Sequence, residues 1–237
     1  HWYPFRAVTE SLSSVGIYQI SPASAREPGD PSGRKELGRT GTNLPAAVQH
    51  LQKTQPEALR ELVRHMQKAV STFSTIETDY VETKQLGLFV KEKGVGRRWF
   101  STDLSDGTLR TLAIFVPLLD SRLSLVAIEE PEDGIHPWII DDFINTCRER
   151  SQQKQVVLTT HSPILVSNLR PAELYLVDRR EGATKIYRAA EVDRSLEEII
   201  KEGVMDLGNY WNSGQMSAVP GGPSLFDLIE GENDDAG

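Results

Sequence analysis

Two adjacent glutamates, Glu129 and Glu130, are the residues of this chain whose types and spacing best suit acid–base or metal chemistry. They follow Ser124–Ile128, a short and mostly apolar run, and Pro131 comes directly after them, which is typical of a buried strand that ends in a turn. In open α/β sheets, ligands bind at the edge where the strands end. Because neighbouring side chains on a strand point to opposite faces, we expect different tasks for the two carboxylates. One would act on the water shell of a metal ion and the other on a nucleophilic water.

Two further segments carry groups that could act together with these carboxylates. Leu104–Arg110 has Ser105 and Gly107 where a helix is predicted to begin, and a helix N-terminus presents backbone N–H groups and a positive dipole end to anions. A second apolar run ends at Thr160 and His161. A bare glutamate pair is more often a solvated turn, and a lone Ser105 is more often a routine N-cap. The fixed order of the three segments is what favours a functional site.

Composition bounds the class of protein that these segments belong to. The chain has 237 residues, of which 38% are hydrophobic and 25% charged, as in an ordinary globular domain with or without a subdomain. The net charge of -8 argues against a chain that is basic overall. Cys147 is the single cysteine, so no intramolecular disulfide framework and no cysteine zinc site is expected, and we interpret it as a core residue. No apolar run approaches the ~18–20 residues of a membrane span. We expect a cytoplasmic protein and, because the sequence begins with His1, a piece of a longer polypeptide.

Hydrophobic periodicity predicts the elements around the three segments. We expect Asn43 to cap a helix, His65 to lie off the apolar stripe of the next helix and face solvent, and Pro117 to kink or end the helix that Ser105 begins. The predicted strands are 15–20, 80–82, 86–90, 98–100, 124–128, 155–160, 174–178 and 184–188, and the predicted helices begin near residues 43, 56, 105, 138, 163 and 195. The acidic end of the chain, from Glu230, is expected to be disordered.

The Gly- and Pro-rich segment 24–43 is predicted to be a loop. We take it as the chain's one local basic excess, either a solvated loop or a contact for phosphate or nucleic acid. Its cations are Arg26, Arg34, Lys35 and Arg39. Gly29–Lys35 superficially looks like a phosphate-binding loop, but three residues rather than four separate its glycines and no strand leads into it, so we reject it.

In their order and spacing, Leu104-Ser-Asp-Gly, the strand ending Glu129-Glu130-Pro131 and the strand ending Thr160-His161-Ser162 resemble the C-terminal half of an ABC-type ATPase head. The resemblance is to the RecF/SMC-like ATPases of the AAA family, including those of bacterial defence systems, and it covers about residues 100–190. It implies an α/β fold with RecA-like strands and helices and a helical or loop insertion subdomain. The implied segments are 1–100 (strand and insertion), 101–190 (ATPase core) and 191–237 (C-terminal helix and acidic tail).

The resemblance also implies a role for each matching residue. Ser105, Asp106 and Gly107 correspond to the signature motif, which contacts the γ-phosphate of ATP held by the opposite subunit. Glu129 and Glu130 correspond to Walker B, with Glu129 helping to hold hydrated Mg²⁺ and Glu130 activating the attacking water. Asp133 lies in the D-loop, which communicates across the dimer, and His161 corresponds to the switch histidine that senses the γ-phosphate.

Three departures from the family pattern limit these implications. Glu129 stands where Walker B usually has Asp, and Thr108 replaces the usual Gln or Glu after the signature glycine. Neither a Walker A motif nor a Q-loop is evident in this sequence, so we expect the nucleotide-gripping half of the site to come from elsewhere. The function implied is ATP hydrolysis by a head that forms a homo-oligomer, dimerising head to head through ATP, with an effector protein, a nuclease or DNA as candidate partners.

Two other functions stay open on the sequence alone. One is a non-catalytic, ATPase-like regulatory or scaffold module that pairs with an effector chain. The other is a nuclease that binds two metals through neighbouring acids, although no Asp-x-Asp pattern is evident near Asp178. The acids in question are Glu129, Glu130, Glu132 and Asp133.

Overall fold

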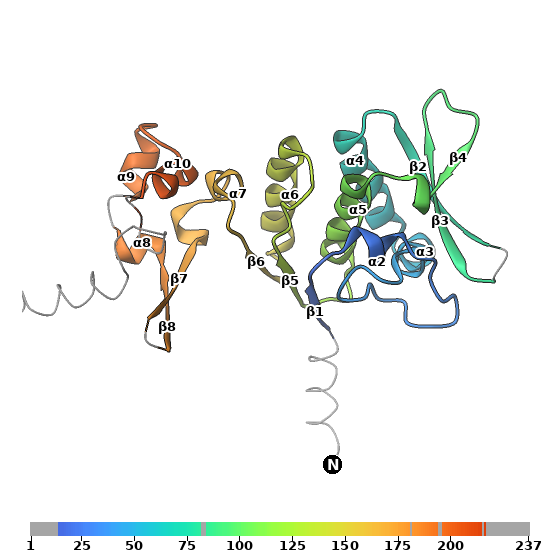
Figure 1. Cartoon of the computed structure of the whole chain (residues 1–237), viewed down its shortest axis with the longest axis horizontal. Coiled ribbons are helices and arrows are strands. Elements are labelled where there is room, and N and C mark those ends of the chain that lie inside the picture. The colour runs from blue at the N-terminus through green and yellow to red at the C-terminus, as the bar shows by residue number, and fades with distance from the viewer. Residues whose placement is uncertain (1–13, 82–83, 181, 194–195, 215, 217–237) are drawn as a thin grey trace, which may run out of the picture. The chain divides into compact units, whose positions relative to one another are not determined.

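The computed structural model describes residues 14–81, 84–180, 182–193, 196–214 and 216, which belong to two compact units (Figure 1). The first unit ends at Thr160 and the second begins at His161. The division into segments 1–100, 101–190 and 191–237 stays a prediction. The acidic end of the chain lies outside the described residues.

A three-stranded parallel sheet positions the two glutamates in the first unit. Strands β1 (Val15–Tyr18), β5 (Leu125–Glu129) and β6 (Gln155–Thr159) lie in the order β1-β5-β6, with Ile17 beside Ala127 and Ala127 beside Val157. The predicted strands at these three places are therefore confirmed. The parallel strands with their crossover helices make this the α/β fold, with a helical insertion, that the sequence predicted.

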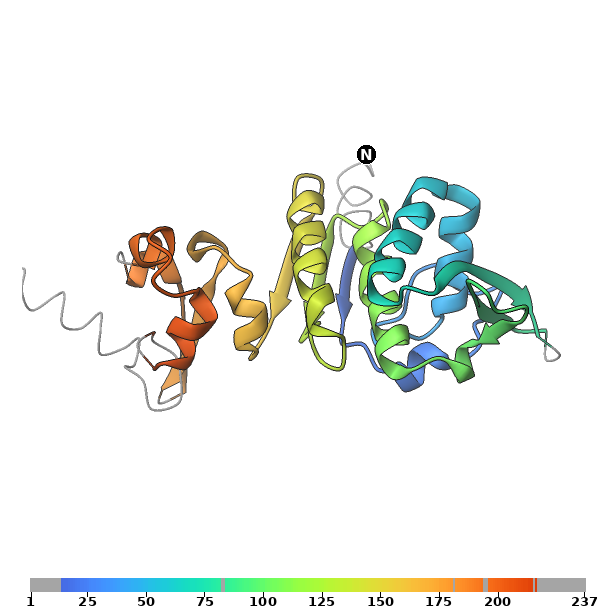
Figure 2. The same cartoon turned by 90° about the horizontal axis from the view of Figure 1, so that it is seen from above.

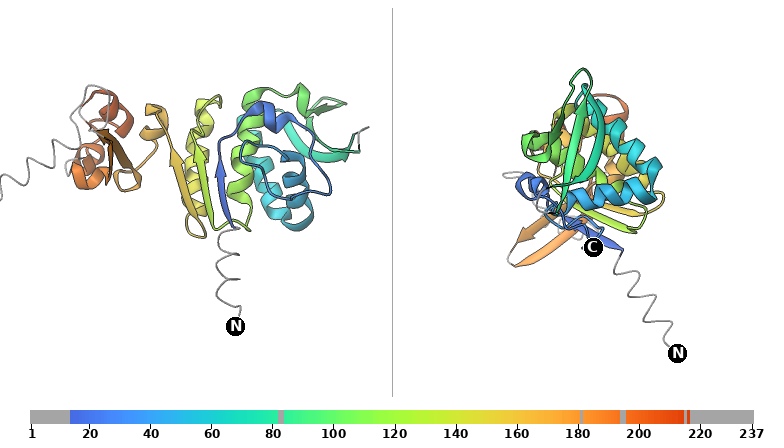
Figure 3. Two further views of the ribbon diagram at one scale, coloured as in Figure 1. Left: turned by 60° about the horizontal axis from the view of Figure 1, so that its bottom comes forward. Right: turned by 90° about the vertical axis from the view of Figure 1, so that its right-hand side faces the viewer.

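Two 14-residue helices carry the apolar stripes that lie against the sheet: α5 (Asp106–Leu119) and α6 (Pro137–Arg150). In Figure 3, left, the strands of the sheet lie in front of α6. Cys147 is buried in the α6 stripe, as predicted, and burial raises the pKa of its thiol. Pro117 lies inside α5, which continues for two more residues before it ends, so the expected termination at the proline comes slightly later.

The insertion between β1 and β5 is a small layer of helices against an antiparallel sheet, at the right of Figure 2. Its elements are α2 (Pro22–Arg26), α3 (Leu44–Thr54), α4 (Pro56–Ala69), β2 (Phe73–Tyr80), β3 (Leu86–Glu92), β4 (Arg98–Phe100) and the single turn η1 (Ser101–Asp103). Between α2 and α3 the chain is mostly turns, bends and irregular backbone, as predicted for 24–43, but the first three residues of that predicted loop, 24–26, belong to α2. Strand β2 begins at Phe73, seven residues earlier than expected, because a bulge between Phe73 and Thr75 hides its alternation in the sequence.

Two side chains in the insertion differ from what the sequence predicted. Asn43 occupies the N-cap position of α3, as predicted, but its side chain makes no capping hydrogen bond: its backbone is left-handed (φ 64°) and its amide group donates to the Arg34 carbonyl. His65 is buried rather than on the surface. Its ring stacks on Phe115 with 4.3 Å between centroids, and its Nδ1 lies 2.5 Å from an Asp142 carboxylate oxygen. The acid on α6 lets a polar residue take a core position on α4.

A second basic segment, the hairpin between β3 and β4, was missed in the sequence. Residues 91–98 contain four cations and one acid, whereas we expected a single basic excess in 24–43. Lys91 and Arg98 form ion pairs with Glu77. Lys93 and Arg97 have no ion pair with any residue that the structure describes, and Arg97 stacks on Trp99 at 3.7 Å from the ring centroid.

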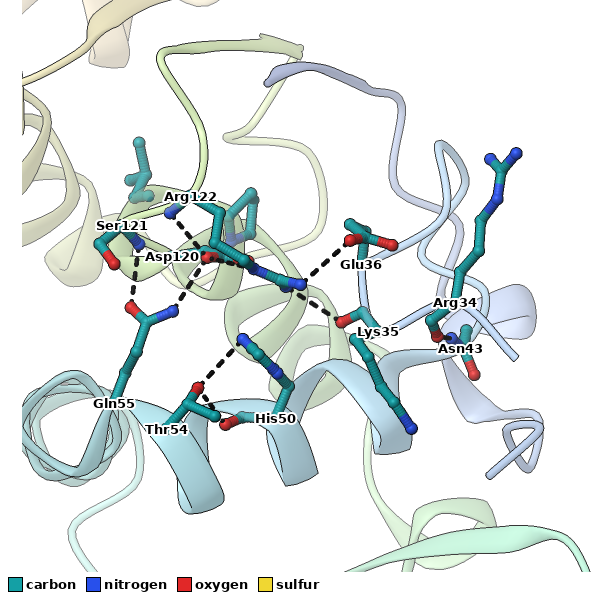
Figure 4. Close-up of polar contacts among 12 residues, drawn as sticks. Arg34, Lys35, Glu36, Asn43, His50, Thr54, Gln55, Asp120, Ser121 and Arg122 are labelled. Carbon is teal, nitrogen blue, oxygen red and sulfur yellow. Dashed lines mark hydrogen bonds and ion pairs between the residues drawn. The ribbon is translucent and has the colours of Figure 1, made fainter. Parts of the chain in front are cut away.

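A buried carboxylate ties the end of α5 to the insertion (Figure 4). Asp120 is 4% exposed and accepts hydrogen bonds from Arg122, including one of 2.6 Å from Nη2, and one of 3.1 Å from Gln55. The same Arg122 guanidinium donates to Glu36 at 3.0 Å. Burial alone would raise the pKa of Asp120, but the hydrogen bonds from Arg122 and Gln55 outweigh it and hold that pKa below its ordinary value.

One face of the parallel sheet is left partly uncovered in the first unit. Val15, Ile17 and Val157 point to the same face and are 39%, 51% and 42% exposed. In the described part of the chain, the sheet also ends at β6, with no further strand paired to it. Parallel sheets are normally covered on both faces, so this face and edge are incomplete as a core.

The second unit has its own hydrophobic core. It comprises α7 (Pro163–Ser167), the turn η2 (Pro171–Glu173), the antiparallel pair β7 (Tyr175–Arg180) and β8 (Ala183–Arg188), α8 (Ala189–Val192), α9 (Leu196–Lys201) and α10 (Leu207–Asn212). The predicted strands near 174–178 and 184–188 are confirmed. No helix among the described residues is long and apolar enough to cross a membrane.

Candidate functional site

Glu129 is the last residue of β5 and lies at the carboxyl edge of the parallel sheet, beside Thr159 of β6. Strand alternation gives its side chain the same face as Ile17 and Val157, the face that is partly uncovered. A carboxylate oxygen of Glu129 is 3.3 Å from the guanidinium of Arg39, a residue of the basic loop. Both side chains are well exposed, so this ion pair is weak and exchangeable.

Glu130 has an unusual backbone. Its φ is 42°, in the left-handed region that a glutamate seldom adopts, and such a residue typically costs on the order of 1–3 kcal/mol. Its N–H donates to the Thr159 carbonyl at 3.0 Å, and its carbonyl accepts from Arg110 at 3.1 Å. Two neighbouring elements therefore hold the turn that carries this carboxylate.

The N-terminus of α5 forms as predicted. Ser105 is its N-cap and accepts a hydrogen bond of 3.2 Å from the Thr108 N–H. The first N–H groups of a helix lack partners within the helix, so the first turn of α5 can bind an anion. Asp106 is turned toward a cation from the insertion, because its carboxylate forms an ion pair with Arg26.

Gly107 brings the first turn of α5 against the turn that follows β5. A Cβ at Gly107 would lie 2.8 Å from the Gly134 carbonyl oxygen, so only glycine fits there without a shift. Asp133, in the same turn, is exposed and 3.8 Å from Arg110. The structure thus brings Ser105, Gly107 and Asp133 to the same side of the first unit as the two glutamates.

The acids that could have formed a nuclease site have different partners. Glu132 accepts a hydrogen bond from the Thr160 hydroxyl, while Glu129 and Asp133 face different arginines. Among the described residues, no group of three His, Cys, Asp or Glu side chains is placed to hold a metal ion. The nuclease alternative therefore gains no support from the geometry.

His161 is the second residue after β6, but it is the first residue of the second unit and is described within that unit. Its role as the switch histidine stays a prediction. The roles of the other site residues are predictions in the same sense, because the structure gives their positions and not their chemistry.

Three arginines at the site were not assigned from the sequence. Arg26 and Arg39 belong to the basic segment 24–43. Its composition marked it as basic but did not indicate which residues it contacts. Arg110 lies one turn into α5, and the sequence alone would predict that a cation there faces solvent. Only the fold reveals that each of the three contacts one of the acidic segments.

The donor set can be tested against the magnesium that an ATP site requires. Mg²⁺ is usually bound by one or two carboxylates together with substrate phosphates and waters, and not by a cage of protein ligands. Glu129 supplies one such carboxylate at an open sheet edge, so it fits this pattern. Arg39 contacts one of the two oxygens of that carboxylate, Oε1.

The sequence matches one protein-family model over residues 8–167, the family described as "AAA domain, putative AbiEii toxin, Type IV TA system". The match covers more than half of the chain and includes β1, the insertion, α5, β5 and β6. The chain therefore belongs to this AAA family. No curated protein matches the sequence significantly.

Solved structures of SMC ATPase heads are similar to this chain. One, from work on the ATP-driven dimerization and DNA-stimulated activation of SMC ATPases, is 12% identical with a TM-score of 0.46, covering 67% of this chain and 98% of its own. The Pyrococcus furiosus Smc head bound to a domain of ScpA is 16% identical (TM-score 0.48; 65% and 40% covered). The Thermotoga maritima SMC head is 13% identical (TM-score 0.40; 63% and 55% covered). The chain spans about half or less of the last two. These similarities are too low to assign a function.

Proposed function

We propose that this chain supplies the hydrolytic half of an ATP site, in an ABC-type head that dimerises around ATP. The observation that carries the proposal is the close approach of the α5 N-terminus, at Gly107, to the turn that follows Glu129 and Glu130. Phosphoryl transfer needs little covalent help from the protein. It needs a positioned water, a metal ion and donors for the γ-phosphate oxygens.

Each group then has one task in the reaction. Glu130 accepts a proton from the attacking water, and a carboxylate in that role contributes about 10²–10⁴-fold to the rate. Glu129 holds part of the water shell of Mg²⁺, which neutralises charge on the phosphates when it is bound. The N–H groups of the first α5 turn and Ser105 donate to the γ-phosphate of ATP on the opposite subunit. A γ-phosphate-sensing role for His161 rests on the resemblance to the switch histidine alone.

The nucleotide-gripping half is proposed to come from another polypeptide segment or chain. The partly uncovered sheet face of Val15, Ile17 and Val157 supports this, because a strand added beside β6 with a helix on that face would complete a sheet covered on both sides. The metal carboxylate Glu129 points to that same face. A phosphate-binding loop carried by the added segment would therefore lie beside it.

DNA is the partner that we favour, with the β3–β4 hairpin as the contact. Lys93 and Arg97 are exposed cations without carboxylate partners among the described residues. Their charge suits a phosphate backbone, and the guanidinium carbon of Arg97 already lies over the Trp99 ring, 3.7 Å from its centroid. An effector protein or nuclease remains a further candidate partner. A role in defence or in DNA repair is an extension of the same proposal.

The test is Glu130→Gln in the intact protein together with its nucleotide-gripping partner. We expect ATP turnover to fall by roughly 100-fold or more, because the amide cannot accept the proton, while ATP-driven dimerisation is kept. Turnover is measured by phosphate release and dimerisation by light scattering. Glu149→Gln, an exposed acid on α6, makes the same change in charge and should leave both unchanged.

Each alternative result has a distinct meaning. Wild-type turnover in Glu130→Gln would remove Glu130 as the general base. If the protein binds a partner chain but neither hydrolyses ATP nor dimerises when ATP is added, the result would instead support the scaffold module.

A further inference from the structure

Arg110 links the helix that begins at Ser105 to the turn that carries Glu130. It lies on α5 and its side chain is only 14% exposed. One guanidinium nitrogen, Nη2, donates to the Glu130 carbonyl at 3.1 Å and lies 3.8 Å from a carboxylate oxygen of Asp133. The guanidinium is therefore directed at the backbone of the turn rather than at solvent.

The backbone of Glu130 is held from both sides. Its N–H donates to the Thr159 carbonyl at 3.0 Å, and its carbonyl accepts from Arg110 at 3.1 Å and from the Asp133 N–H at 3.2 Å. The φ of 42° between these two anchors is one that a non-glycine residue keeps only when its surroundings impose it. Thr159 fixes the peptide before this φ, and the peptide after it is fixed by the Asp133 N–H within the turn and by Arg110, which is the only side chain outside the turn that donates to this carbonyl among the described contacts.

Burying the Arg110 guanidinium against the Glu130 carbonyl costs folding free energy, which a residue with a purely structural task would not need to spend. Nε of Arg110 is buried without a hydrogen-bond partner among the described residues, and the nearest carboxylate is beyond hydrogen-bond distance. An apolar side chain of similar length would bury no unpaired donor, and such replacements are often neutral for stability. Stability alone therefore does not account for an arginine at this position.

The contact between Gly107 and the Gly134 carbonyl makes the link two-sided. The first turn of α5 touches the far end of the 130–134 turn, while Arg110, one helical turn later, holds its near end. A displacement of the α5 N-terminus must therefore displace the turn. An anion bound at Ser105 would in this way alter the placement of the Glu130 carboxylate.

We propose that Arg110 is a positioning residue, which keeps Glu130 in its left-handed conformation and couples it to occupancy of the α5 N-terminus. The coupling rests on the function proposed above, whereas the backbone restraint does not. The two parts can consequently fail separately.

The experiment uses the full chain with Arg110→Met and Arg110→Gln, neither of which can reach the Glu130 carbonyl with a charged donor. Backbone ¹³C chemical shifts and the HN–Hα coupling of Glu130 report φ directly in protein labelled at glutamate and assigned with Glu130→Gln. We expect the left-handed signature in the wild type and its loss in both variants, with thermal stability nearly unchanged. Arg64→Met, at an exposed position on α4, is the matched control and should keep the signature.

The same variants are then assayed for ATP turnover with the nucleotide-gripping partner present. We expect kcat to fall about 10–100-fold while KM for ATP stays within about twofold, since Arg110 acts on the base and not on ATP binding. Variants that keep both the Glu130 signature and kcat would overturn the proposal. So would variants that both fail to fold, because Arg110 would then be a structural residue.

A third result would separate the two proposals. If the signature is lost in the variants but the wild type hydrolyses no ATP, the positioning role stands and the proposed ATPase function falls.

Discussion

Asp120 offers a sharp test of the packing that joins the insertion to α5. In Asp120→Asn the side chain keeps its shape but loses the charge that Arg122 and Gln55 bind (Figure 4). Hydrogen bonds to a charged group are worth about 1.5–3 kcal/mol each, and breaking a fully buried ion pair costs about 3–5 kcal/mol. Arg122 is 30% exposed and keeps Glu36, so we expect a lower cost of roughly 2–3 kcal/mol at pH 7.

The pH dependence of that cost follows from the lowered pKa of Asp120. A carboxyl with a pKa below its unfolded value, about 3.9, stabilises the fold fully above that value and stops doing so as pH falls through the folded pKa. The difference in unfolding free energy between wild type and Asp120→Asn should therefore be constant from pH 7 to 5 and shrink toward pH 3. Urea unfolding followed by circular dichroism at each pH measures it.

Glu36→Gln is the matched control, because Glu36 contacts the same guanidinium at 3.0 Å but is 47% exposed. Exposed pairs are worth about 0–1 kcal/mol, so this variant should cost little at any pH. The reasoning fails if Glu36→Gln costs as much as Asp120→Asn. It also fails if the cost of Asp120→Asn at pH 3 equals its cost at pH 7.

Two further predictions concern the basic hairpin and the buried histidine. Lys93→Glu with Arg97→Glu should weaken DNA binding at least tenfold and reduce the slope of log affinity against log salt by about 2, since each phosphate contact contributes about 0.9. Arg34→Glu with Lys35→Glu, in the segment 24–43, changes the charge equally and is the matched control. DNA affinity is measured by fluorescence anisotropy titration. A larger loss of affinity in the control would assign the DNA contact to the segment 24–43. His65→Ala should cost about 2–4 kcal/mol in urea unfolding, because it leaves a cavity beside Phe115 and removes a partner from Asp142. A cost within 0.5 kcal/mol, the usual range for a surface position, would contradict the buried role.

The sequence was sufficient for the elements with strong periodicity. Strands β5 and β6 and helices α5 and α6 are short apolar runs or clear stripes with turn residues at their ends, so local signals agreed with the tertiary fold. Strand β2 was only partly predicted, because its sequence Phe-Ser-Thr-Ile-Glu-Thr-Asp-Tyr is mostly polar and a bulge breaks its alternation. His65 was misjudged for a related reason. A helical stripe identifies apolar residues, and a buried histidine is recognised only through the acid it meets, 77 residues away.

Side-chain partners at the candidate site lay beyond any local signal. Arg39 and Glu129 are 90 residues apart, and Arg26 and Asp106 are 80 apart, so composition could mark the loop as basic without saying what it contacts. The fold-level prediction gave the sheet edge. The arginines that contact the acids at this edge could be identified only from the tertiary structure.

Glu130 is where the local rules and the structure disagree most informatively. A residue that precedes proline is driven toward extended backbone, and Pro131 follows Glu130, so local reasoning predicts an extended glutamate. The φ of 42° violates that expectation, and the hydrogen bonds from Arg110 and the Asp133 N–H and to Thr159 hold it. Natural sequences break local rules mainly at functional or strained positions. Of the two adjacent acids, the one with the strained backbone is therefore the stronger candidate for the general base, and the ordinary strand-end Glu129 fits the less demanding task of holding the water shell of a metal ion.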